Sequence, residues 1–92
     1  MILKAFSIRD QKSEVYNSPF FKSTHGEAER DFRSACNDEK TMIAKYPEDF
    51  DLYYIGEYDD NKGQFKPIDT PQHILKAIAC IAKKQNLSEA KN

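Results

Sequence analysis

Aromatic and acidic side chains gather in the stretch YPEDFDLYYIGEYDDNKGQF, from Tyr46 to Phe65, and its rings, together with nearby lysines, could bind a nucleic acid. Exposed tyrosine and phenylalanine rings stack on nucleobases, at about 1–3 kcal/mol per base, and lysine ammonium groups contact phosphates. The same rings could instead fill the core of a β-hairpin, and nearby acids such as Asp51 and Glu57 would repel phosphate. The candidate site consists of four rings for bases and two lysines for phosphates: Tyr53, Tyr54, Tyr58, Phe65, Lys62 and Lys66.

Other kinds of chemistry find little support in the sequence. The histidines and cysteines do not have the spacing of a preformed zinc site, and DDNKG fails the EF-hand pattern because Gly63 comes one place early, counting from Asp59. The carboxylates of PEDFD fit a solvated turn better than acid–base catalysis. No phosphate-binding glycine motif is present among only three glycines. We therefore expect a protein that is not an enzyme and uses no metal or cofactor.

Length and composition predict one small domain that acts in a reducing compartment. The chain has 92 residues, a net charge of -1 and 39% hydrophobic residues, which argues against binding DNA through bulk positive charge. Its two cysteines, Cys36 and Cys80, are expected to be buried, reduced thiols. The N-terminal residues resemble neither a signal peptide nor a membrane span, so we expect a cytoplasmic protein with no membrane partner.

Two helices are predicted. The first covers residues 25–37, with Thr24 as N-cap and Glu27 completing a capping box, and its apolar stripe includes Ala28 and Phe32. The second follows Thr70 as N-cap and Pro71 at the first helical position, and it extends to about residue 84. Its apolar stripe is wider than one sheet face needs.

Strands are predicted on either side of the first helix. Residues 2–8 and the VYNSPFF segment form a first hairpin, and residues 51–58 pair with QFKPI through a turn at DDNKG. Strict alternation places Tyr53, Ile55 and Glu57 on one side of the third strand, and Leu52, Tyr54 and Tyr58 on the other. The result is an α+β fold: a small antiparallel sheet in β-β-α-β-β-α order with two helices packed on one face. Residues 1–86 form the domain, and residues 87–92 form a frayed tail.

Several of these motifs together resemble a known viral family. SPFF, a helix beginning GEAERDF, and the core PEDFDLYYIGEYDDNKGQF resemble the small nonstructural protein of gokushovirus-type microviruses, phages with circular single-stranded DNA. The resemblance covers residues 3–68, and the family usually carries histidine where this chain has Tyr46.

The resemblance implies a protein of the host bacterial cytoplasm that takes part in viral single-stranded DNA synthesis or packaging. Binding to single-stranded DNA is the expected mechanism. The alternative is an interaction module that forms a homodimer, or that binds phage or host replication proteins, without touching DNA. The wide apolar stripe of the predicted last helix and the near-neutral charge favour that alternative.

Overall fold

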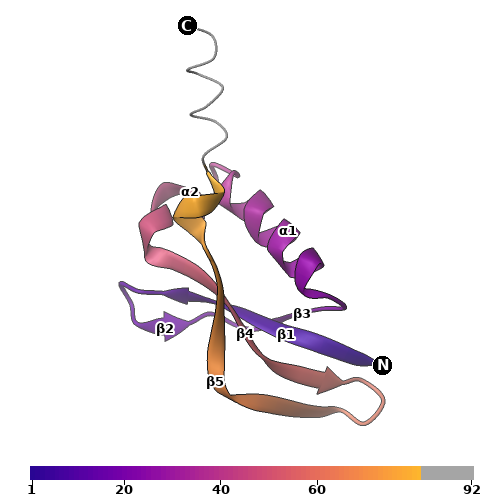
Figure 1. Ribbon diagram of the computed structural model, residues 1–92. Helices are drawn as coiled ribbons and strands as arrows, with labels where there is room; N and C mark the ends of the chain where they lie inside the picture. Colours follow the sequence, from indigo (N-terminus) through magenta and orange to yellow (C-terminus); the bar gives the residue numbers. More distant parts are fainter. Residues whose placement is uncertain (82–92) are drawn as a thin grey trace, which may run out of the picture.

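A five-stranded antiparallel sheet forms most of the computed structural model, which describes residues 1–81 (Figure 1). The strand order is β2-β1-β4-β5, and β3 pairs with β1 beside β2. The chain is thus of the α+β class, as predicted. The strands are β1 (Ile2–Asp10), β2 (Val15–Tyr16), β3 (Phe20–Lys22), β4 (Phe50–Asp59) and β5 (Gln64–Lys76). The helices are α1 (His25–Cys36) and α2 (Met42–Lys45), with short 3-10 turns η1 (Pro47–Asp49) and η2 (Ala77–Cys80).

Helix α1 begins where the sequence predicts. The Thr24 hydroxyl accepts a hydrogen bond from the Glu27 backbone N–H at 3.1 Å, and the Glu27 carboxylate accepts one from the backbone N–H of Ser23, also at 3.1 Å. This is a capping box in which the glutamate reaches one residue further back than usual. The helix lies over one side of the sheet (Figure 1), toward which it directs its buried residues Ala28, Phe32 and Cys36.

The hydrophobic core lies between α1 and the sheet. Phe6 of β1 and Leu52 of β4 are fully enclosed there with Phe32. Cys36 and Cys80 are free thiols in the same cluster, and burial, followed by the neighbouring Cys80 thiol, raises the pKa of Cys36 to about 12. The prediction of buried, reduced thiols is therefore confirmed.

The second predicted helix is wrong. Residues 71–76 continue β5, and only Ala77–Cys80 form a helical turn, which is 3-10 in type. Thr70 and Pro71 lie within the strand, which bends between its two halves (Figure 1). Pairing with β4 overrides the helical spacing, since Leu75 lies opposite Leu52 and packs against the core. Residues 82–86 of the predicted domain and the predicted tail 87–92 lie outside the described residues.

A β-bulge at Ile55 changes which side chains share a face. Phe6 pairs with Tyr54 and Ala5 pairs with Gly56, so Ile55 is the extra residue of β4. An extra residue shifts the alternation by one. The predicted faces are therefore wrong beyond Tyr54, because Tyr58 shares a side with Tyr53 and not with Tyr54.

Candidate nucleic-acid interface

The sheet has a second side, opposite α1, that no described helix covers; we call it the far face. Its members follow from the strand register, since alternate residues of each strand and their cross-strand partners share one side. On β1 these are Ala5, Ser7 and Arg9, which lie beside β4 residues of the same side. The aromatic residues of the far face are Tyr16, Phe21, Tyr53, Tyr58, Phe65 and His73.

Rings on the far face touch one another in two clusters. Tyr53 lies edge-on to both Tyr16 and His73, with ring centroids 5.3 Å apart in each pair. Phe21 and Tyr58 form the second cluster, at 5.2 Å, and Phe65 is the cross-strand neighbour of Tyr58. Aromatic contacts at these separations are favourable and hold the rings in place. Tyr16, Phe21 and Phe65 nevertheless keep 43%, 39% and 44% of their surface exposed, so each cluster offers ring surface to a ligand.

Gly56 allows Phe65 to lie across the sheet. A Cβ at Gly56 would stand 3.0 Å from the end of the Phe65 ring and 2.5 Å from the Lys66 carbonyl oxygen. The backbone oxygen cannot move aside without disturbing the pairing of β4 and β5. Glycine at this position therefore lets the Phe65 ring lie directly against β4, on the side of the second cluster.

We expect Gly56→Ala to lower the free energy of unfolding by about 1–3 kcal/mol, the usual cost of forcing atoms into a packed region. Urea denaturation followed by circular dichroism measures this loss. Gly63→Ala is the matched control for space alone, because a Cβ there meets nothing within 4 Å, although the φ of 65° at Gly63 adds backbone strain. An unchanged denaturation midpoint for Gly56→Ala would contradict the close approach.

Two cationic side chains lie on the far face. The Arg9 guanidinium lies over the Tyr16 ring, 5.7 Å from its centroid, and Lys76 has 61% of its side chain exposed. The carboxylate of Asp51 is the acid among them, but only 9% of its side chain is exposed. It is held at 2.8 Å by His73 Nε2 and at 4.0 Å by Lys76 Nζ. A phosphate approaching the rings thus meets cations before it meets Asp51.

The six residues predicted from the sequence fall into three places. Tyr53, Tyr58 and Phe65 lie on the far face. Tyr54 lies on the helix side, where its ring packs 4.8 Å from His25 and 5.6 Å from Phe6. Burial, and then the charge of Glu57, raise the pKa of the Tyr54 hydroxyl. Tyr54 is therefore part of the packing under α1 and not of the far face.

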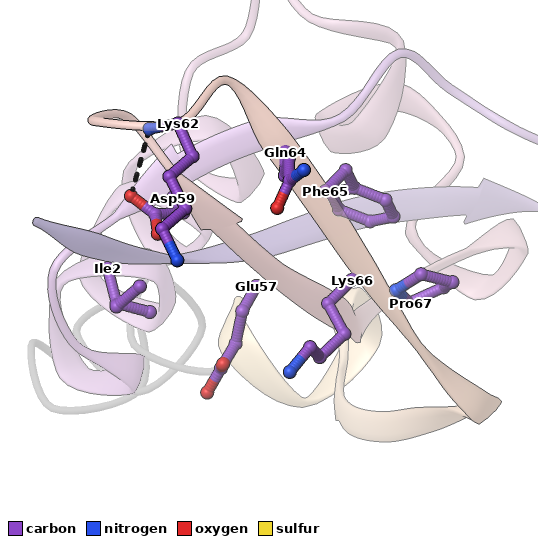
Figure 2. A pocket seen from close by; sticks show the side chains of 8 residues that line it. All are labelled: Ile2, Glu57, Asp59, Lys62, Gln64, Phe65, Lys66 and Pro67. Atoms are coloured by element: carbon purple, nitrogen blue, oxygen red, sulfur yellow. Dashed lines mark hydrogen bonds between the residues drawn. The ribbon is translucent and has the colours of Figure 1, made fainter.

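Lys62 and Lys66 meet at an open pocket of about 460 Å³ on the β4–β5 hairpin. Figure 2 shows Glu57 and Lys66 pointing to the same side of the hairpin, while the Phe65 ring points away from them. The Lys62 backbone N–H donates to Asp59 at 3.3 Å, which closes the turn (Figure 2). Lys62 thus lies in the turn before β5, and Lys66 follows Phe65 in β5. The acids Glu57 and Asp59 line the same pocket.

The site predicted from the sequence did not include His73 and Lys76, nor Arg9 and Tyr16. The first two were assigned to a helix. Their position beside Tyr53 depends on the pairing of β5 with β4 across 22 residues of sequence. The dipeptides KP and TP, each with a proline that favours extended backbone before it, were the available signal for a strand.

Two further properties concern the described part of the chain. Within residues 1–81, no three His, Cys, Asp or Glu side chains gather closely enough to hold a metal ion. Among those residues, no helix has the length and apolar character needed to cross a membrane.

These features define a small α+β protein whose sheet is packed on one side and lined with exposed rings on the other. The chain belongs to the Phage ORF5 protein family, which matches residues 3–80. It is 43% identical over 68 residues to Protein ORF5 of Chlamydia phage 1, an alignment that covers 70% of this chain and 71% of that protein. Chlamydia phage 1 is a gokushovirus-type microvirus, so the resemblance noted in the sequence is confirmed. No solved structure matches the chain.

Proposed function

We propose that this phage protein binds single-stranded DNA through the far face and takes part, without catalysing a reaction, in the synthesis or packaging of viral DNA. The observation that carries the proposal is the pair of exposed ring clusters bordered by Arg9 and Lys76. Rings that are held by their neighbours and keep exposed surface suit base stacking, which every base permits. Membership of a phage family whose relatives include a gokushovirus-type protein is consistent with this role.

The proposed path of the single-stranded DNA runs along both sides of the edge strand β5. Bases stack on Tyr53 and on the pair Tyr58 and Phe65, and phosphates near the first cluster meet Arg9 and Lys76. Past Phe65, the sugar–phosphate backbone of the DNA reaches Lys62 and Lys66, the two lysines of the hairpin pocket. This arrangement relies on stacking more than on charge, which fits a chain whose net charge is only -1.

Fluorescence anisotropy with a labelled homothymine oligonucleotide, titrated with the protein across a salt series, tests the proposal. We expect binding at low salt, with log K falling against log salt by no more than about 3, since four cations contribute about 0.7 each on single strands. A duplex of the same length should bind more weakly, because its stacked bases cannot reach the rings. Absence of binding at low salt would overturn direct contact with DNA.

A second candidate function, protein–protein interaction, has one specific observation in its favour. Met42 and Tyr46 are 59% and 51% exposed, beside an open pocket of about 400 Å³ that Phe50 also lines. A second copy, or a phage or host replication protein, could bury these side chains. The original basis for this candidate, an apolar stripe on a last helix, does not hold for residues 71–76, because they form a strand. Sedimentation at several concentrations distinguishes a dimer from a monomer.

A further inference from the structure

The contact between His73 and Asp51 stands at the centre of the first ring cluster. His73 Nε2 and Asp51 Oδ2 are 2.8 Å apart, and the His73 ring lies edge-on to Tyr53. When the imidazole is neutral the contact is a hydrogen bond, and the carboxylate keeps its negative charge on the far face. When the imidazole is protonated the contact becomes an ion pair, and the two charges cancel. The charge of the far face therefore depends on one imidazole.

Several other polar groups face this pair. Tyr53 comes from β4, Lys76 from β5, Arg9 from β1, and Tyr16 from β2. Between about pH 5.5 and about pH 7.5, histidine is the side chain among these types whose charge ordinarily changes, while lysine, arginine and tyrosine keep theirs. The chain contains only two histidines. The other, His25, packs against Phe6 and Tyr54 on the helix side, away from the far face.

We propose that His73, held by Asp51, makes the affinity of the far face for single-stranded DNA rise as the pH falls. The inference deepens the proposed function and rests on it. The sign follows from the net charge of the His73–Asp51 pair: protonation changes it from negative to neutral, so the pair repels the phosphates that follow the stacked bases less strongly. Deprotonation restores the negative charge, so the affinity declines as the pH rises.

The experiment measures binding of a labelled homothymine oligonucleotide of about 12 nucleotides, within the usual range of single-strand site sizes. Anisotropy titrations are run at about pH 5.5 and about pH 7.5, which bracket the ordinary histidine range. Thymine has no group that titrates there, so a change in affinity belongs to the protein. This one-unit change in the charge of the pair should raise K by at most about five- to tenfold near 50 mM salt, and steepen the salt slope by at most about 0.7.

Two variants assign the effect to one histidine. His73→Asn should bind with the same affinity and salt slope at both pH values, whereas His25→Gln should keep the full pH dependence. Circular dichroism checks that each variant is folded. If His73→Asn fails to fold, the His25→Gln protein still decides, because His73 is then its one histidine. Retention of the pH effect by His25→Gln supports the assignment, and its loss overturns it.

The outcomes also separate this inference from the function on which it rests. Binding by the unmodified protein that does not change with pH overturns the role of His73 and leaves DNA binding standing. A pH effect that survives in folded His73→Asn likewise overturns it. Absence of binding at every pH overturns both proposals together.

Discussion

Replacing Tyr53 and Phe65 together by alanine should weaken binding to a homothymine oligonucleotide by at least about thirtyfold. Each stacked base contributes about 1–3 kcal/mol through its ring, so two rings contribute about 2–6 kcal/mol. The two losses should nearly add, because Tyr53 contacts Tyr16 and His73, whereas Phe65 lies next to Tyr58 in the other cluster. Anisotropy titration of the unmodified, single and double variants at one salt concentration measures both the losses and their additivity.

Tyr46→Ala is the matched control for this experiment. It also removes an exposed tyrosine ring, but one that lies next to Met42 and Phe50 and not on the far face. We expect its DNA affinity to match that of the unmodified protein. Thermal unfolding of each variant establishes that a weaker affinity is not a loss of fold. A folded double variant that binds as tightly as the unmodified chain would show that DNA, if bound, uses another surface.

Local signals were enough to predict the first helix and the strand that contains Tyr53. The helix over residues 25–37 needs only neighbouring residues: Thr24 and Glu27 fix its start, and Ala28, Phe32 and Cys36 share one stripe. The strand from Phe50 to Asp59 was recognisable from its aromatic and β-branched residues. Such features depend on contacts between residues close in sequence, which a single sequence displays directly.

The second half depended on contacts that a single sequence does not display. A helical spacing is shared by Ile74, Ala77, Ile78 and Ile81. Residues 64–76 nevertheless pair with β4, whose edge away from β1 has no other partner strand. Short apolar runs are ambiguous between helix and strand, and tertiary pairing decides between them. Because a helix was predicted there, His73 and Lys76 were not included in the candidate site.

One extra residue explains the misplacement of Tyr58. Period-two counting assumes an unbroken ladder, but the bulge at Ile55 shifts the faces on either side of it. Tyr58 then joins Tyr53 on the far face, and Tyr54 packs against His25 under α1. Nothing in the letters YYIGEY marks the bulge except the glycine after it, and a glycine has several other uses in strands. The chemistry of the rings was predictable, but their division between two faces was not.

The last prediction compares the helix side of the sheet, which forms the hydrophobic core, with the far face, which is proposed to bind DNA. Phe6→Ala should lower the free energy of unfolding by about 3–5 kcal/mol, the range for a fully buried phenylalanine. Phe6 is 0% exposed and contacts Phe20, His25 and Tyr54 on the helix side. Phe21→Ala is the matched control, since Phe21 of neighbouring β3 lies on the far face and is 39% exposed. Chemical denaturation of both variants measures the difference.

A large gap between the two phenylalanine variants means that one side of the sheet holds the fold and the other is free for binding. Phe21→Ala should then lose DNA affinity while keeping most of its stability, and Phe6→Ala should bind DNA normally in proportion to its folded fraction. Equal destabilisation by the two substitutions would mean that the far-face rings are themselves structural core. In that case stacking on bases would compete with folding, and the nucleic-acid interface would lose its physical basis.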